Sequence, residues 1–255
     1  MQKLYKKKDF RDNCGFGLIA SIDGVKSRKI ITDSINALIS MTHRGGIGAD
    51  GKTGDGCGLL VDINETYYKD LIYKEQKIDL DESFAIGQMF YFDQIEKLLP
   101  RIKKILKDEK LKLITYREVP IDKNVLGDIA LKCLPNIYQI FISPANKNLS
   151  ENQFQTSLLQ SRKLIEEIYL NDEKLYFCSF SSKTIIYKGL MLPKDIKSFY
   201  IDLKSKDFIS AICVFHQRFS TNTTPRWHLA QPFRFLAHNG EINAIRGNRN
   251  WVKAR

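Results

Sequence analysis

The chain has 255 residues, of which 43% are hydrophobic and 27% are charged, and its formal net charge is +11. No apolar run reaches the roughly 18 residues of a membrane-spanning helix, and no apolar stretch follows the lysine-rich start, which argues against a secretory signal. Five scattered cysteines without a Cys-x-x-Cys pair argue against a disulfide framework or a zinc site. We therefore expect a cytoplasmic globular protein with one large domain or two small ones.

The positive charge raises the question of a nucleic-acid partner. The basic residues are interleaved with acidic ones along the chain, and only Lys6, Lys7 and Lys8 form a tight run. The sequence has no aromatic RNA-binding motif and no zinc-finger spacing. Because net charge alone affects solubility and nonspecific association, we expect a solvated lysine-rich surface and neither a nucleic acid nor a membrane as partner.

Apolar periodicity predicts a mixture of strands and helices along the whole chain. Strands are predicted at 14–22, 58–63, 84–92, 111–119, 137–143, 176–180, 184–187, 210–219 and 233–238. Helices are predicted at 28–43, 64–73, 93–107 and 152–169, and the polar tail 241–255 can also form a helix. The strands at 176–180 and 184–187 are expected to form a hairpin. Elements in this order indicate layered sheets with helices outside them.

The segment Asn13-Cys14-Gly15-Phe16-Gly17 places a cysteine between a short polar leader and the first predicted strand. If the leader 1–13 is removed, Cys14 becomes the first residue and carries both a thiol and a free α-amine. Such a residue can use its own amine as the general base, and the two groups titrate at about 8.5 and about 8. The alternative is an internal, buried cysteine, because free cysteines are among the most buried residues.

A glycine-rich loop is predicted after the first helix. Residues 46–53 match the phosphate-loop pattern, but that loop binds phosphate only where it follows a strand and opens a helix. Here a helix is predicted before the loop, and three glycines lie within 54–58 after it, so we expect a tightly turned loop near a site. Arg44, at the end of the predicted helix, either complements the helix dipole or enters the cleft beside the nucleophile.

Two later motifs carry polar groups suited to an amino-acid substrate. Arg218 offers a planar fork for a carboxylate, and Thr221 offers a hydroxyl close to it. The Asn239 amide and the Gly240 N–H can donate to one oxyanion, although Asn-Gly is also a strong hairpin signal. Together with Cys14, these motifs describe an enzyme that attacks the side-chain amide of an amino acid.

With these motifs the sequence resembles the class II glutamine amidotransferases, which are N-terminal-nucleophile hydrolases. Within that family it is most similar to the N-terminal part of the large subunit of bacterial glutamate synthases. The long separation between Cys14 and Asn239 favours glutamate synthase over its sister families. The matching stretches are 11–20, 41–45, 49–58, 216–223, 225–227, 229–234 and 238–243.

The resemblance implies a four-layer α/β/β/α sandwich, with a removable leader at 1–13 and a glutamine amidotransferase domain over 14–255. It implies that Cys14 attacks the δ-carboxamide of L-glutamine and forms a glutamyl thioester, while the freed α-amine shuttles the proton. The ammonia released serves glutamate synthesis from 2-oxoglutarate in the complete enzyme.

The resemblance also implies roles for the other site residues and for cofactors. Asn239 and Gly240 would hold the oxyanion, Arg218 and Thr221 would bind the α-carboxylate of glutamine, and Arg44 would line the same pocket. No cofactor or metal is expected on this segment. FMN and a 3Fe-4S cluster are expected in the remainder of the large subunit, and FAD and NADPH on a small partner subunit.

Two alternatives stay open beside this reading. The chain ends before the aspartate that holds the substrate amine in the family, so the domain is expected to be incomplete at its C-terminus. One alternative is therefore a non-catalytic segment that needs a downstream polypeptide. The other is a papain-like hydrolase that pairs Cys14 with His216 or His238 and with Asn239, although that mechanism needs no free N-terminus and gives the motif 218–221 no role.

Overall fold

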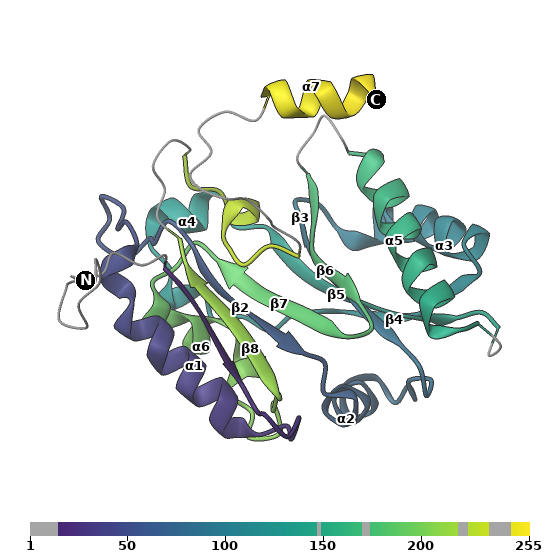
Figure 1. Cartoon of the computed structure of the whole chain (residues 1–255), viewed down its shortest axis with the longest axis horizontal. Helices are drawn as coiled ribbons and strands as arrows, with labels where there is room; N and C mark the ends of the chain where they lie inside the picture. The colour runs from purple at the N-terminus through teal and green to yellow at the C-terminus, as the bar shows by residue number, and fades with distance from the viewer. Residues whose placement is uncertain (1–14, 147–148, 170–173, 219–223, 235–245) are drawn as a thin grey trace, which may run out of the picture.

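The computed structural model describes residues 15–146, 149–169, 174–218, 224–234 and 246–255 (Figure 1). Its strands are β1 (Phe16–Ala20), β2 (Cys57–Asp62), β3 (Ala85–Tyr91), β4 (Leu111–Glu118), β5 (Asn136–Pro144), β6 (Leu175–Ser181), β7 (Thr184–Gly189) and β8 (Ile212–Gln217). Its α-helices are α1 (Arg28–Ser40), α2 (Glu65–Gln76), α3 (Leu99–Asp108), α4 (Asp128–Lys132), α5 (Glu151–Glu167), α6 (Ile196–Phe199) and α7 (Arg246–Ala254). Short 3-10 turns connect them at η1 (Thr42–Arg44), η2 (Ile95–Lys97), η3 (Lys123–Val125), η4 (Pro193–Asp195), η5 (Ile201–Lys204) and η6 (Trp227–Leu229).

In the described part of the chain the strands form two antiparallel sheets of four strands each. The first sheet has the order β1-β8-β2-β7 and the second has the order β4-β5-β3-β6. In the first sheet Phe16 lies opposite His216, and Cys57 lies opposite Gln217. This register brings the start of β1, the end of β8 and the start of β2 to one corner of the sheet.

Helices lie against each sheet (Figure 1). α1 packs against β1 and β8, whereas α3 packs against β4 and α5 against β6. The start of α1 is fixed by Ser27, whose side chain accepts a hydrogen bond from the Ile30 N–H, and α5 starts with a reciprocal capping box between Ser150 and Gln153. Such caps satisfy N–H groups that have no partner within the helix.

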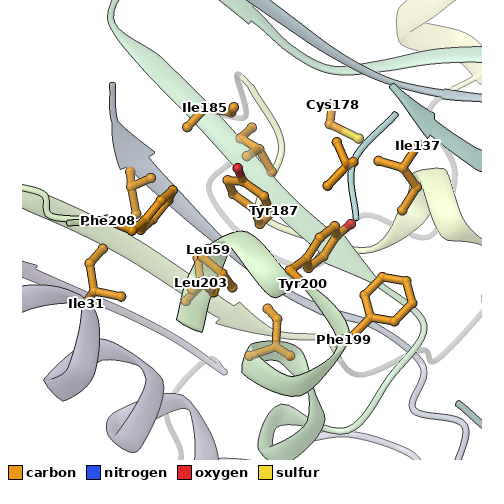
Figure 2. Close-up of a cluster of buried hydrophobic side chains, with 14 of the residues drawn as sticks. Ile31, Leu59, Ile137, Cys178, Ile185, Tyr187, Phe199, Tyr200, Leu203 and Phe208 are labelled. Atoms are coloured by element: carbon orange, nitrogen blue, oxygen red, sulfur yellow. The ribbon is translucent and has the colours of Figure 1, made fainter. Parts of the chain in front are cut away.

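The larger hydrophobic core joins side chains of both sheets with α1, α2 and α6. Side chains along β5 point alternately to the two faces of its sheet. Ile137 and Phe141 belong to this core, while Ile140 and Ile142 belong to a second core under α3 and α5. Figure 2 shows part of the larger core, with Leu59, Ile137, Cys178, Tyr187 and Tyr200 among its members.

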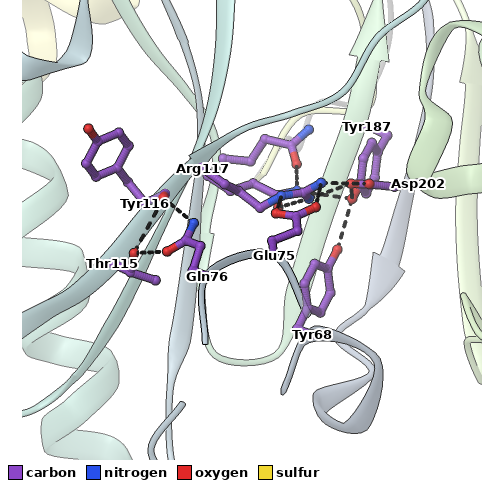
Figure 3. A network of polar contacts seen from close by, with 10 residues as sticks. Tyr68, Glu75, Gln76, Thr115, Tyr116, Arg117, Tyr187 and Asp202 are labelled. Carbon is purple, nitrogen blue, oxygen red and sulfur yellow. Dashed lines mark hydrogen bonds and ion pairs between the residues drawn. The ribbon is translucent and has the colours of Figure 1, made fainter. Parts of the chain in front are cut away.

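A buried polar network also links the two sheets (Figure 3). The guanidinium of Arg117 in β4 donates from Nη1 and Nη2 to the two carboxylate oxygens of Asp202, at 2.9 and 3.0 Å. It also donates to Gln139 Oε1 at 2.9 Å and, from Nε, to Glu75 Oε2 at 3.0 Å. Tyr187 of β7 donates its hydroxyl to Asp202 at 2.9 Å, so the network reaches from the second sheet to the first.

Most predicted elements are present, and two predictions need correction. The hairpin predicted from 176–180 and 184–187 is wrong, because β6 and β7 belong to different sheets and the turn between them carries the chain from one to the other. The helix predicted from residue 93 starts only at Leu99, after the turn η2, with Pro100 in its first turn, where a proline is tolerated.

The end of the chain is described only in part. Residues 233 and 234 of the strand predicted at 233–238 are not in a strand, and the remainder of that prediction lies outside the described residues. The polar tail contains the helix α7. The helices α4 and α6, of 5 and 4 residues, were not predicted because they are too short to show a helical period.

Candidate active site

The ends of β1 and β8 place Gly15 directly beside Gln217. The Gln217 backbone N–H donates to Gly15 O at 2.5 Å and so extends the β1–β8 ladder. A Cβ at Gly15 would lie 2.2 Å from Gln217 O and 3.4 Å from the Cβ of Arg44. Consecutive Cα atoms are about 3.8 Å apart across a trans peptide bond. Cys14 lies outside the described residues, and it is bonded to a residue that contacts this corner.

Arg44 reaches the corner through η1, the turn that follows α1. The last turn of α1 contains no basic residue, and Arg44 lies beyond the helix, so it is not part of the helix terminus as one reading of the sequence supposed. The next residue, Gly45, leaves room for the side chain of Gln217, because a Cβ there would lie 1.6 Å from Nε2 of Gln217 as it is placed. This close approach lets the turn lie over the end of β8.

Arg218 lies just beyond β8 and is 7% exposed. Its backbone N–H donates to Gly56 O at 2.8 Å, and its Nη1 donates to Asp55 O at 3.2 Å. Gly56 has a φ of +128°, and a Cβ there would lie 2.9 Å from the Cβ of Ala230, so glycine alone suits both its conformation and its surroundings. Burial lowers the pKa of the Arg218 guanidinium, and the nearby charge of Asp55 opposes that effect.

The glycine-rich loop is held in place through Asp50. Its carboxylate accepts from the Thr53 N–H at 2.8 Å, from the Thr53 hydroxyl at 2.6 Å and from the Ile129 N–H at 2.9 Å. Thr53 Oγ1 in turn accepts from the Ala130 N–H at 3.1 Å. These bonds lower the pKa of Asp50 well below its usual value. The loop leads into β2 at Cys57 and not into a helix, so it lacks the geometry of a phosphate-binding loop, as predicted.

The last two residues of β8, the half-buried His216 and the buried Gln217, precede Arg218 in the chain. Nδ1 of His216 and both amide atoms of Gln217 are buried and make no hydrogen bond with any described residue. Burial, and then the charge of Arg218, lower the pKa of His216 to about 4, so its imidazole is neutral near pH 7. Gln217 was missed by the sequence analysis. The signal was its position, because it follows Cys213 and Phe215 on the buried side of the alternating strand.

The structure describes two of the predicted site residues, Arg44 and Arg218, and brings both to the same corner. The Cβ of Arg44 lies 3.4 Å from the position that a Cβ on Gly15 would take, and Arg218 follows Gln217, whose backbone N–H donates to Gly15 O. The other predicted site residues, Cys14, Thr221, Asn239 and Gly240, lie outside the described residues. The geometry therefore supports a cationic binding corner next to the predicted nucleophile.

The described residues do not fit a metal or an iron–sulfur cluster. No group of three or more His, Cys, Asp or Glu side chains among them could hold a metal ion. Cys57, Cys178 and Cys213 are buried, and burial raises the pKa of Cys178 and of Cys213 to about 12. Among the described helices, none is long and apolar enough to span a membrane.

Comparison with known proteins gives a consistent family match. The model of the class-II glutamine amidotransferases matches residues 14–255. The chain is 40% identical over 264 residues to the large chain of an NADPH glutamate synthase from Azospirillum brasilense, covering 98% of this chain and 17% of that protein. The corresponding large chain from Bacillus subtilis is 39% identical over 262 residues, covering 100% of this chain and 17% of the relative.

A chloroplastic/mitochondrial ferredoxin-dependent glutamate synthase 1 from Arabidopsis thaliana is 37% identical over 252 residues, covering 96% of this chain and 16% of that protein. The chain therefore spans 16–17% of the length of these three relatives. These relatives are named after different electron donors, NADPH in two cases and ferredoxin in the third, and all three match this chain over nearly its whole length.

Proposed function

Because the chain belongs to the class II glutamine amidotransferases, we propose that it carries the glutamine-hydrolysing step of a glutamate synthase, with Cys14 as nucleophile after removal of residues 1–13. The family match begins at residue 14, which supports this start. The two antiparallel sheets with helices against each of them support the four-layer sandwich of N-terminal-nucleophile hydrolases.

In the proposed reaction the free α-amine of Cys14 takes the proton of its own thiol, and the thiolate attacks the δ-carbon of glutamine. Asn239 and the Gly240 N–H donate to the oxyanion that forms on the carboxamide oxygen. The C–N bond then breaks, the amine returns its proton to the leaving nitrogen, and ammonia departs. Water hydrolyses the remaining glutamyl thioester to glutamate and restores the thiol.

The position of Arg44 and Arg218 next to the hydrogen-bonded pair Gly15 and Gln217 is the observation that carries this proposal. Arg218 is a buried cation whose guanidinium is oriented by Asp55 O at 3.2 Å, and its planar fork suits a carboxylate. We assign the α-carboxylate of glutamine to Arg218 and Thr221, and the wall of the pocket to Arg44. A substrate held there by its carboxylate would present its side chain to the residue bonded to Gly15.

The state of His216 argues against a papain-like mechanism that pairs Cys14 with this histidine; His238, the other histidine considered for that role, lies outside the described residues. That mechanism needs an imidazole that takes the thiol proton and forms a thiolate–imidazolium pair. His216 has a pKa of about 4 because it is buried beside Arg218, so it is a weak base near pH 7. The proposed mechanism needs no histidine.

We propose that the released ammonia is used elsewhere in a longer protein. The relatives named as glutamate synthases extend far beyond the matched segment. We propose that, in such a protein, the ammonia reaches a second domain that uses FMN and a 3Fe-4S cluster to make glutamate from 2-oxoglutarate. A small subunit with FAD would supply electrons from NADPH. None of these groups takes part in a step assigned to the present residues.

Covalent labelling tests the role of Cys14. The mature chain, starting at Cys14, is incubated with an electrophilic glutamine analogue and analysed by intact and peptide mass spectrometry. We expect one adduct on Cys14, none in Cys14→Ala, and an unchanged adduct in Cys133→Ala, which removes a cysteine that is exposed in the structure. Modification of Cys133 with Cys14 untouched would contradict the proposal.

A second candidate function is a non-catalytic segment that becomes active only with a downstream polypeptide. This candidate is favoured by coverage, because the chain matches only 17% of the length of each of these relatives. Ammonia release from glutamine by the mature chain alone, and with the following domain of a relative added, separates the two. Release by the chain alone excludes the second candidate, whereas release only in the mixture supports it.

A further inference from the structure

A cavity of about 450 Å³ lies between α5 and the strands β6 and β7, and no residue assigned to glutamine hydrolysis lines it. Its size falls within the range of about 300–1,000 Å³ found for small-molecule sites. Figure 1 shows α5 next to β6 at this place. Arg162 of α5 and Arg234 line it together with hydroxyl side chains, and no Asp or Glu is among its described lining residues.

The two arginines share one carboxylate. Arg162 Nη1 pairs with Glu166 Oε2, and Arg234 Nη2 lies 3.4 Å from Glu166 Oε1. Nη1 of Arg234 is buried and has no hydrogen-bond acceptor among the described residues. Burial, and then the charge of Arg234, lower the pKa of Arg162. Among the described residues, these two guanidinium groups therefore pair with a single carboxylate, and buried charges in proteins are normally paired.

A third cation adds to this excess. Lys188 of β7 is fully buried, with its Nζ 4.6 Å from the centre of the Tyr176 ring and 4.9 Å from that of Phe233. Both of these rings line the cavity. Lys188 Nζ donates to Ala230 O at 2.7 Å, a neutral acceptor, and it pairs with no carboxylate among the described residues, so it adds positive potential to the cavity wall.

Two serines supply donors at the cavity wall. Ser179 Oγ accepts from the Ile186 N–H at 3.2 Å, and Ser181 Oγ accepts from the Lys183 N–H at 2.9 Å and the Thr184 N–H at 3.3 Å. A hydroxyl that accepts from a backbone N–H retains its own O–H to donate. Guanidinium and hydroxyl donors facing one space suit a ligand group that only accepts hydrogen bonds, as an ionised carboxylate does.

We propose that this cavity is a carboxylate-binding site, in which Arg162 and Arg234 hold the carboxylate and Ser179 and Ser181 donate to it. The carboxylate comes either from a free small acid or from an acidic side chain of a polypeptide. The same groups would recognise both, because the charge and the acceptor geometry are the same. The proposal does not depend on the glutamine reaction, and its test can be made in the Cys14→Ala chain.

Titration calorimetry with sodium glutarate, at constant ionic strength set with chloride, tests the proposal. We expect saturable binding that Arg162→Gln and Arg234→Gln each weaken by about tenfold or more, because each removes a charge-assisted hydrogen bond. Arg101→Gln, an exposed arginine on α3, is expected to leave the affinity unchanged. Absence of saturable binding to the unmodified chain would overturn the proposal.

A second pair of variants avoids the Arg–Glu–Arg cluster, so that a folding defect cannot hide the answer. Leu159 and Leu164 are both exposed on α5, and only Leu159 lines the cavity. Leu159→Glu places a competing carboxylate at the arginines and is expected to weaken glutarate binding by about tenfold, whereas Leu164→Glu changes the net charge equally and leaves the affinity unchanged. Equal weakening by both variants would show a nonspecific charge effect and refute the site.

A third arm distinguishes the two sources of the carboxylate. A blocked extended peptide with one glutamate is titrated beside glutarate, with the same peptide carrying glutamine as its control. Tighter binding of the glutamate peptide than of glutarate assigns the site to a polypeptide side chain, and the reverse order assigns it to a free acid. Binding of the glutamine peptide as tight as that of the glutamate peptide would contradict carboxylate recognition.

Discussion

Single residues at the β1–β8 corner decide which groups can approach one another. Gly15 and Gly45 leave space that the backbone and the side chain of Gln217 occupy, and Gly56 leaves space for Ala230. At each of these positions a methyl group would meet another atom at less than 3 Å. The glycines of this region therefore act as points of contact between segments, and the corner depends on them for its close packing.

His216 gives a pH-dependent contribution to stability. Its pKa in the folded chain is about 4, below the value of about 6.5 for an unfolded histidine. Between these values the unfolded chain binds a proton that the folded chain does not, so the contribution is complete above about pH 6.5 and is lost as the pH falls toward 4. We expect the loss to reach about 3 kcal/mol at most.

Urea unfolding between pH 4.5 and 7.5 measures this contribution. His216→Gln is expected to flatten the fall of the unfolding free energy below pH 6.5, whereas the same change at the exposed His43 leaves the slope as it was. An unchanged slope in His216→Gln would mean that the imidazole titrates normally in the folded chain.

At the scale of elements, Asp50 joins the glycine-rich loop to the start of α4. Asp50→Ala removes acceptors from the N–H groups of Thr53 and Ile129. We expect a lower thermal unfolding midpoint and faster amide hydrogen exchange at Ile129 and Ala130, because unsatisfied N–H groups at a helix start weaken its first turn. Asp79→Ala, at an exposed aspartate, is the matched control and should change neither quantity.

Elements with a local signal could be predicted from the sequence, and those that depend on distant partners could not. Periodicity predicted the helix at 152–169, which the structure has as α5, and the strand predicted at 84–92 is present as β3. The role of Asp50 could not be predicted, because its partner Ile129 is distant in sequence. The hairpin prediction for β6 and β7 failed for a related reason, since a short turn does not reveal whether its strands share a sheet.

The same distinction applies to the candidate site. The motif around residue 44 and the motif around residue 218 indicated binding groups, and the structure places both at one corner with Gly15. Gln217 and the support of Arg218 by Asp55 depend on burial and on contact between segments, which residue types alone do not reveal. The predictions for Cys14 and Asn239 stay predictions, because those residues lie outside the described part of the chain.

At the scale of the whole molecule, Arg117 of β4 forms a buried ion pair with Asp202 of η5, with side chains 2% and 3% exposed. Because Asp202 also accepts from the Tyr187 hydroxyl of β7, this pair is part of the link between the two sheets. Arg117→Met leaves the Asp202 carboxylate buried without its cation, and we expect a loss of about 3–5 kcal/mol in the free energy of unfolding. The double variant Arg117→Met/Asp202→Leu should recover much of this loss, because it removes both charges. Urea unfolding of the three chains measures the difference.

Glu75 provides the control for this prediction. It pairs with the same guanidinium, and its side chain is 38% exposed, so Glu75→Gln is expected to cost less than about 1 kcal/mol. A loss in Glu75→Gln as large as that in Arg117→Met would contradict the view that burial of Asp202 sets the cost.

The order of strands in the two sheets has a consequence for folding during synthesis on the ribosome. β3 to β6 follow one another along the chain and form the second sheet among themselves, whereas the first sheet is made from strands on both sides of them. β1 is therefore synthesised early and can pair with β8 only after β8 has been made. Its residues Phe16 and Leu18 are each 57% exposed in the folded chain. Pairing across so long a loop is entropically costly and slow. The corner that holds Gly15 against Gln217 is thus among the last parts to assemble. Until β8 pairs with it, β1 has two open edges that a chaperone or another nascent chain can occupy, and afterwards one edge has no partner among the described strands.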